Sequence, residues 1–149
     1  LWARRPETTL LIAGATPDRR VKALQSSKIH VSGWLDDIRD AYRGGRIFIA
    51  PMRIGTGLQN KLLEAMSMGL PCITTSLAQQ ALGGQPGTDL IVADTSDKIA
   101  DAALYLITNQ EGASKMAYAG KRFVRQHYHW ESATEKLSQA MVNLVKPQS

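Results

Sequence analysis

The segment at residues 46–75 restricts the fold more than any other part of the chain. It reads RIFIAPMRIGTGLQNKLLEAMSMGLPCITT: an apolar run, a loop with two glycines, an amphipathic stretch and a second apolar run. The apolar runs have the length of strands, and the spacing of Leu62, Leu63 and Met66 predicts a helix over residues 59–68. A strand, a loop, a helix and a second strand form a unit typical of parallel sheets.

The start of this helix carries an unusual charge. Lys61 lies in the first turn, where the positive end of the helix dipole disfavours a cation. Departures from such local rules are typical of functional sites. Free backbone N–H groups, the dipole and an ammonium together favour an anion, so the pattern predicts a phosphate site.

The rest of the chain repeats the alternation of strands and helices. The predicted strands are residues 8–13, 28–32, 46–50, 72–75 and 89–93, and the predicted helices are residues 17–25, 36–43, 59–68, 96–108, 113–127 and 131–145. Residues 76–84 are predicted to form a short helix or a loop. This pattern predicts a single α/β domain over residues 1–149: a parallel sheet of about five strands with helices on both faces as a core to residue 130, then a closing helix at residues 131–149. Ligands bind such sheets beyond the carboxyl ends of the strands, so the loops at residues 14–18 and 51–59 are the predicted site.

Composition agrees with an ordinary globular domain. Of 149 residues, 44% are hydrophobic and 21% charged, which suits one domain with a real core. The excess of 18 basic over 13 acidic residues fits an anionic ligand such as a nucleotide, or an anionic membrane surface. Aromatic residues are few and not interleaved with basic ones, so we expect no nucleic-acid partner.

Other features narrow the location and the chemistry. No stretch approaches 18 apolar residues and no signal peptide is evident, so we expect a cytoplasmic protein. Cys72 is the only cysteine and lies in an apolar run, so it is predicted to be a core residue. No cluster of His, Asp or Glu has the spacing of metal ligands. The first residue is Leu1 rather than Met, which suggests a piece of a longer chain.

The stretch GTGLQNKLLEAMSMGLPCITT resembles the donor-site signature of group 1 glycosyltransferases, retaining (family 4-like) nucleotide-sugar enzymes of the GT-B fold. LLIAG, HVSGWLDDIRDAYRGGRIFIAPMRIGTG and HYHWESATEKL resemble further segments of the same C-terminal domain in the same order. The resemblance implies a Rossmann-like donor-binding domain of a hexosyltransferase. The enzyme would transfer a sugar from a nucleoside diphosphate sugar to a saccharide or lipid-linked acceptor, as in bacterial polysaccharide biosynthesis, without cofactor or metal.

The resemblance also implies roles for individual residues. Glu64 matches the helix glutamate that binds the donor ribose hydroxyls, and a carboxylate suits this task because it accepts two bonds at once. Arg53 and Lys61 are the implied diphosphate contacts, and Gly55 and Gly57 let the backbone approach closely.

Two further positions concern the sugar and the base. Thr56 stands eight residues before Glu64, where the family often has a second glutamate that faces the donor sugar, so this chain departs from the common pattern. Gly33, Trp34 and Leu35 resemble the stretch that lies against the nucleobase through backbone groups, with Trp34 expected to pack rather than to stack on the base.

The family's C-terminal domain opens with a strand and a glycine-rich loop that nothing before Thr8 resembles, and we expect these 149 residues to hold no part of its N-terminal acceptor domain. In the order 3-2-1-4-5-6 the missing strand is the central one. Closing the sheet over it gives the order 2-1-3-4-5, and a partner chain that fills the gap is the alternative. We expect this chain alone to bind nucleotide weakly, possess no catalytic residue of its own and catalyse nothing. Peripheral contact with the inner face of the membrane is a further expectation.

Several alternatives remain open at this stage. Arg53 and Lys61 could be plain surface charges, and Glu64 could simply pair with Lys61 three residues away. A GT-B nucleotide-sugar epimerase shares the architecture but not the glutamate signature. A flavodoxin-like binding module is a third possibility, although Gly14 and Ala15 after the first strand are a poor match for its loop.

Overall fold

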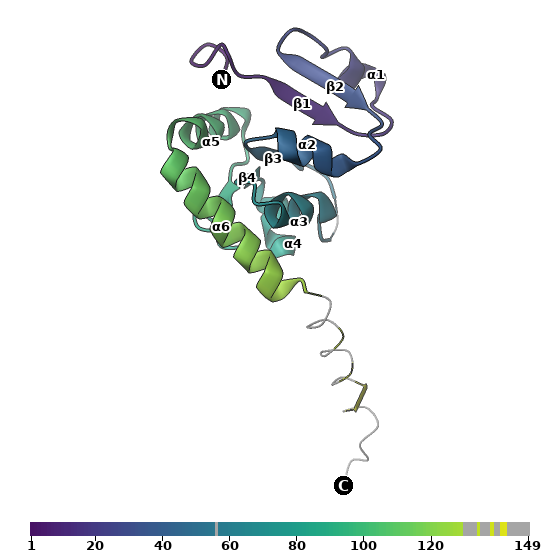
Figure 1. Cartoon of the computed structure of the whole chain (residues 1–149), viewed down its shortest axis with the longest axis vertical. Coiled ribbons are helices and arrows are strands. Elements are labelled where there is room, and N and C mark those ends of the chain that lie inside the picture. The colour runs from purple at the N-terminus through teal and green to yellow at the C-terminus, as the bar shows by residue number, and fades with distance from the viewer. Residues whose placement is uncertain (56, 130–133, 135–137, 139–140, 143–149) are drawn as a thin grey trace.

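The computed structural model describes residues 1–55, 57–129, 134, 138, 141 and 142. Strands and helices alternate along the chain, with every strand pair parallel, so the α/β prediction is confirmed (Figure 1). The elements are β1 (Leu10–Ala13), α1 (Arg19–Lys22), β2 (Ile29–Gly33), α2 (Ile38–Gly44), β3 (Phe48–Ala50), α3 (Asn60–Ser67), β4 (Cys72–Thr74), α4 (Ser76–Leu82), β5 (Ile91–Val92), α5 (Ser96–Thr108) and α6 (Gln110–His127).

The strands form two sheets rather than one. β1 pairs with β2, and β3, β4 and β5 pair in that order, with Phe48 opposite Cys72 and Thr74 opposite Val92. The predicted order 2-1-3-4-5 is therefore wrong in one respect: in the described part of the chain, β1 and β3 do not pair. The neighbours within each sheet are as predicted.

Helix α2 connects the two sheets. It contacts β1 on one side, and its Tyr42 packs into the core against Phe48 of β3, with ring centroids 5.7 Å apart.

Two clusters of buried side chains lie on the two faces of the three-stranded sheet. Cys72 belongs to the cluster formed with α3 and α4, and its neighbour Ile73 belongs to the cluster formed with α5 and the start of α6. Successive side chains of a strand point to opposite faces, so helices cover both faces, as predicted. Burial raises the pKa of the Cys72 thiol to about 12, which agrees with its expected core position.

Two helices begin later or earlier than predicted. Helix α1 begins at Arg19 instead of residue 17, because its N-cap is Asp18, whose carboxylate accepts from the Arg20 N–H. Helix α6 begins at Gln110 instead of residue 113, because the Asn109 side chain accepts from the Gly112 N–H at 2.9 Å. The predicted helix at residues 131–145 lies outside the described residues, apart from residues 134, 138, 141 and 142.

Among the helices that are described, none combines the length and the apolar character needed to cross a bilayer.

Candidate functional site

The loop between β3 and α3 is held at its base by two buried threonines. The Thr74 hydroxyl donates to the Ala50 carbonyl at 3.0 Å, and the Thr75 hydroxyl donates to the Met52 carbonyl at 2.7 Å. Thr74 ends β4 and Thr75 follows it directly, so the carboxyl end of the adjacent strand positions the loop. This role was not predicted from the sequence, although two hydroxyl residues at the end of an apolar run are a signal that could have indicated it.

The two loop glycines have backbone angles that favour glycine. Gly55 has φ +144° and Gly57 has φ +80°. A Cβ on Gly55 would also come within 3.2 Å of the Gln59 side-chain nitrogen. These conformations are compatible with the close backbone approach predicted for both residues. Thr56 lies outside the described residues, so its role remains a prediction.

Helix α3 starts without a side-chain cap or an acidic residue in its first turn. Its N-cap is Gln59, whose amide donates to the Gly57 carbonyl at 3.2 Å instead of accepting from the helix. Lys61 in the first turn and Arg53 in the loop are exposed, and neither side chain makes a hydrogen bond or an ion pair with any residue that the structure describes. The positive field of the helix start is therefore not neutralised locally, as an anion site requires.

Glu64 has a specific partner, which is not Lys61. The Tyr42 hydroxyl of α2 donates to the Glu64 Oε2 at 2.8 Å. Burial raises the pKa of Tyr42 far above its ordinary value, and the hydrogen bond to Glu64 raises it further, so the phenol stays protonated and donates. The two residues are 22 positions apart, and no pattern in the sequence connects them.

The loop that follows β2 is open to solvent. Gly33 has φ +69°, Leu35 is half-buried, and the side chain of Trp34 is exposed, with a relative accessibility of 72% for the residue. The Trp34 indole N–H donates to the Asp36 carboxylate at 3.2 Å. The expectation that Trp34 packs is therefore wrong: the indole is held at its polar edge while its faces remain available.

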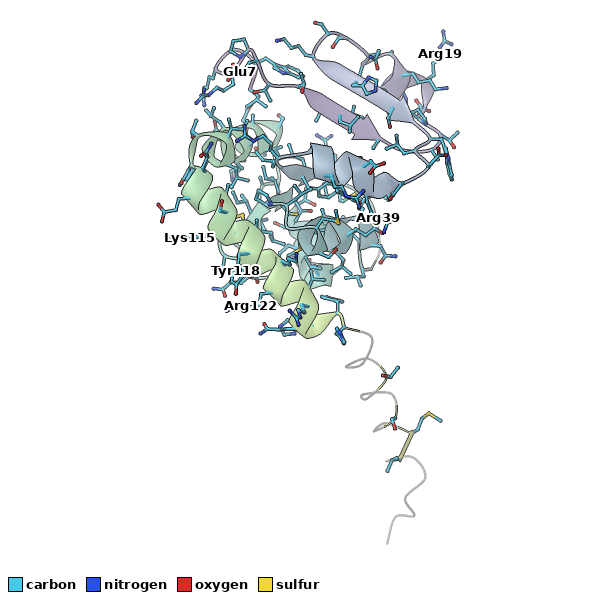
Figure 2. The ribbon with its side chains drawn as sticks, viewed as in Figure 1. Glu7, Arg19, Arg39, Lys115, Tyr118 and Arg122 are labelled. Carbon is cyan, nitrogen blue, oxygen red and sulfur yellow. The ribbon has the colours of Figure 1, made fainter. Side chains whose placement is uncertain are left out.

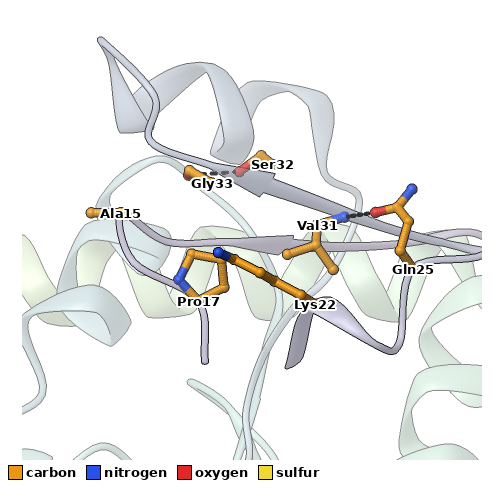
Figure 3. A pocket seen from close by; sticks show the side chains of 7 residues that line it. All are labelled: Ala15, Pro17, Lys22, Gln25, Val31, Ser32 and Gly33. Carbon is orange, nitrogen blue, oxygen red and sulfur yellow. Dashed lines mark hydrogen bonds between the residues drawn. The ribbon is translucent and has the colours of Figure 1, made fainter. Parts of the chain in front are cut away.

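A cavity of about 380 Å³ lies beside this loop, between the carboxyl ends of β1 and β2 and helix α1 (Figure 3). Its wall is fixed by the Gln25 side-chain oxygen, which accepts from the Val31 N–H at 2.7 Å. The lining consists of Ala15, Pro17, Lys22, Gln25, Val31, Ser32 and Gly33. It includes one predicted site residue, Gly33, and part of the predicted loop at residues 14–18.

The predicted site residues thus fall into two groups. Arg53, Gly55, Gly57, Lys61 and Glu64 belong to one loop and the helix that follows it, beyond the carboxyl end of β3. Gly33, Trp34 and Leu35 end β2 and follow it, beyond the carboxyl end of the other sheet. Both groups lie where parallel sheets bind ligands.

No group of three or more His, Cys, Asp or Glu side chains suited to a metal ion occurs among the described residues. Independence from metal ions remains a prediction.

Comparison with known proteins gives related results at the level of sequence and of structure. The family model described as glycosyl transferases group 1 matches residues 1–109. A GDP-mannose-dependent monoacylated alpha-(1-6)-phosphatidylinositol monomannoside mannosyltransferase from Corynebacterium glutamicum is 28% identical over 149 aligned positions, which cover 91% of this chain and 39% of the relative. The chain spans well under half of the length of the curated relatives it matches, 24% of one and 39% of the other.

Two solved structures share the fold. The C-terminal domain of a group 1 family glycosyl transferase (LpcC) from Francisella tularensis has a TM-score of 0.71 and 23% identity, with coverage of 87% of this chain and 74% of that one. HepE from Anabaena in complex with UDP has a TM-score of 0.80 and 11% identity, with coverage of 93% and 42%. The fold is therefore the Rossmann-like domain of GT-B glycosyltransferases. The family model covers more than half of the sequence, so the chain belongs to the glycosyl transferases of group 1.

Proposed function

We propose that this chain is the C-terminal donor-binding domain of a retaining, family 4-like glycosyltransferase. The complete enzyme moves a hexosyl group from a nucleoside diphosphate sugar to a saccharide or lipid-linked acceptor. The observation that carries the proposal is the uncapped start of α3, beside which the side chains of Lys61 and Arg53 have no partner among the described residues, with Glu64 one turn further along. The GDP-mannose dependence of the corynebacterial relative and the UDP and UDP-glucose complexes of HepE support a nucleotide-sugar donor.

The diphosphate lies at the start of α3. Negative charge grows on the leaving diphosphate as the bond to the sugar breaks. The helix dipole and the side chains of Lys61 and Arg53 stabilise this charge, in the role that a metal ion has in other transferases. Gly55 and Gly57 allow backbone N–H groups to approach the phosphates.

Glu64 binds the ribose and transfers no proton. One of its oxygens is taken by Tyr42, and the other is left to accept from ribose hydroxyls. The base lies against Gly33, Trp34 and Leu35, next to the cavity that Gly33 lines. Thr56 is proposed to face the sugar in place of the usual glutamate.

Titration of the chain with UDP and GDP by calorimetry tests this site. Lys61→Ala and Arg53→Ala are each expected to weaken binding about fivefold to tenfold, because each removes a charge-assisted contact with phosphate. Lys115→Ala is the matched control: Lys115 is an exposed helix lysine that pairs with Glu111 on α6, and its loss leaves the affinity unchanged (Figure 2). Equal affinities in all three variants would mean that the phosphate lies elsewhere.

We also propose that the acceptor is bound by a part of the enzyme outside this domain. The chain spans 39% of its mannosyltransferase relative, which leaves ample length for such a part. The 149-residue chain is then catalytically inactive by itself. Hydrolysis or transfer of a nucleotide sugar by the purified chain would contradict this.

A cytoplasmic location and peripheral contact with an anionic membrane are further parts of the proposal, and the exposed side of α6 supports the membrane contact. Lys121, Arg122 and Arg125 are exposed, and Tyr118, at 71%, adds an amphipathic ring (Figure 2). Basic and aromatic side chains of this kind suit the interface of an anionic bilayer. Co-sedimentation with vesicles that contain phosphatidylglycerol, but not with pure phosphatidylcholine vesicles, is the expected result. Equal recovery with both vesicles would exclude the contact.

A further inference from the structure

Tyr42 is a buried residue that bonds to an exposed carboxylate. The residue is 7% exposed and its ring packs in the core cluster with Leu62 and Met66. Its hydroxyl donates to the Oε2 of Glu64 on α3 at 2.8 Å. The Lys61 carbonyl, at 3.4 Å from the same hydroxyl, is a much weaker acceptor.

The hydrogen bond from Tyr42 holds the carboxylate of Glu64 in place, although the glutamate side chain is flexible. Glu64 lies on the exposed side of α3, where a glutamate normally samples several rotamers. A hydrogen bond between a neutral donor and a carboxylate is stronger than one between neutral groups. Because the tyrosine ring is held in the core, the bond ties the Glu64 carboxylate to the rigid part of the domain.

We propose that Tyr42 is a positioning residue that orients the Glu64 carboxylate for the ribose of the donor. Tyr42 occupies Oε2, so Oε1 is left to accept from a ribose hydroxyl, and the ring of Tyr42 itself does not touch the ligand. This inference rests on the proposed function, in which Glu64 binds the ribose. The proposal adds Tyr42, a residue of α2, to a site that otherwise lies on α3 and the loop before it. The orientation of Glu64 toward the nucleotide then depends on how α2 packs against α3.

A structural role alone would give a different result from a positioning role. If the hydroxyl only links α2 to α3, its removal lowers stability but leaves the preference for ribose over deoxyribose intact. If the hydroxyl orients Glu64, its removal weakens that preference. The contrast between ribonucleotides and deoxyribonucleotides therefore separates the two roles.

The experiment is a calorimetric titration of the chain with UDP, GDP and their 2′-deoxy and 3′-deoxy counterparts. The wild-type chain is expected to favour at least one ribonucleotide over its deoxy counterpart. Tyr42→Phe keeps the ring and the packing, and it is expected to reduce this ratio about fivefold to tenfold, mainly by weakening the binding of the ribonucleotide. Glu64→Gln is expected to reduce the ratio at least as much.

Tyr128→Phe is the matched control. The Tyr128 hydroxyl donates to the Leu82 carbonyl at 2.6 Å, and its ring packs on the same core cluster as Tyr42. Both variants thus lose one partly buried tyrosine hydroxyl bond. Tyr128→Phe should lower the denaturation midpoint and leave the ratio of affinities at the wild-type value.

The outcomes distinguish this inference from the proposed function. A reduced ratio in Glu64→Gln with an unchanged ratio in Tyr42→Phe would overturn the role of Tyr42 alone. An unchanged ratio in Glu64→Gln, or no measurable binding of either nucleotide, would contradict the proposed ribose site, and the role of Tyr42 would fall with it. An equal reduction in Tyr42→Phe and Tyr128→Phe would identify a general loss of packing and also overturn the inference.

Discussion

The strands of both sheets alternate with helices along the chain, but the strands of one sheet are much more buried than those of the other. In the three-stranded sheet, all three residues of β4 are buried, and helices cover both faces. In the two-stranded sheet, every residue of β1 and β2 is exposed or only partly buried, although all four residues of β1 are apolar. Parallel strands are usually covered on both faces. The contrast shows that the alternation of strands and helices predicts an α/β fold without predicting which strands form its centre.

The difference also separates the two halves of the candidate site. The loop that carries Arg53, Gly55 and Gly57 leaves a strand whose neighbour is fully buried. Thr74 at the end of that neighbour bonds to the last residue of β3, and Thr75, which follows it, bonds to Met52 in the loop. The loop that carries Gly33 and Trp34 leaves the open sheet. The proposed phosphate and ribose contacts therefore lie on the more rigid part, and the proposed base contacts lie on the less covered one.

The largest expected effect tests this contrast directly with two leucines. Leu62 is fully buried in the first core cluster, so Leu62→Ala should lower the free energy of unfolding by about 2–5 kcal/mol. Leu11 in β1 is 43% exposed, and Leu11→Ala should cost less than about 1 kcal/mol, since little apolar surface is lost from the interior. Urea denaturation measures both. Equal losses would mean that β1 is as well packed as the three-stranded part.

A smaller effect is expected from two helix glycines. A Cβ on Gly120 of α6 would lie 2.8 Å from the Asp89 carbonyl oxygen, so Gly120→Ala should destabilise the chain by about 1–3 kcal/mol. Gly44, at the end of α2, has no atom within 4 Å of such a Cβ and is the control. Gly44→Ala should be neutral or stabilising, by up to about 1 kcal/mol, because alanine favours helix. A stable Gly120→Ala variant would show that α6 is free to move away from the sheet.

Much of the fold follows from the sequence, and the exceptions have physical causes. Helix α5 has the predicted bounds because Thr95 caps it and Asp97 suits its first turn. The predicted pairing of β1 with β3 is wrong, because the division into two sheets depends on how distant parts of the chain pack, which no local pattern specifies. The bond between Tyr42 and Glu64 was missed for the same reason: it joins two helices, and each residue by itself fits a simpler role.

Some features of the loop after β3 could be predicted from local sequence patterns, and others depend on the fold. The glycines and the cation at the helix start follow from local rules about backbone angles and dipoles, so the sequence alone indicates an anion site there. The partners that hold the loop, Thr74 and Thr75, come from the next strand and are visible only once the parallel register is known. The exposure of Trp34 likewise depends on what covers the open sheet, which its neighbours in sequence do not determine.

The smallest expected effect concerns acid stability and compares two exposed carboxylates. Asp94, after β5, accepts from the Ser76 hydroxyl and N–H at 2.6 and 2.8 Å, and these bonds hold its pKa below the ordinary 3.8. Asp18 has a lowered pKa too, but its bonds are to Arg20 only two residues away. A carboxyl with a lowered pKa stabilises the fold above pH 3.8, and this contribution is lost as the pH falls through the lower, folded value.

Asp94→Asn should therefore lower the thermal midpoint at pH 6 and bring it closer to wild type near pH 2.5, because it removes a bond that connects β5 to the start of α4. Asp18→Asn should have a weaker effect on the midpoint at either pH, since its bonds are local and lie on the open sheet's side of the molecule. Calorimetric melting of both variants across this range gives the comparison. If Asp18→Asn were the more damaging change, the two-stranded part would be as tightly coupled to global unfolding as the three-stranded part, and the contrast between the sheets would not extend to their stability.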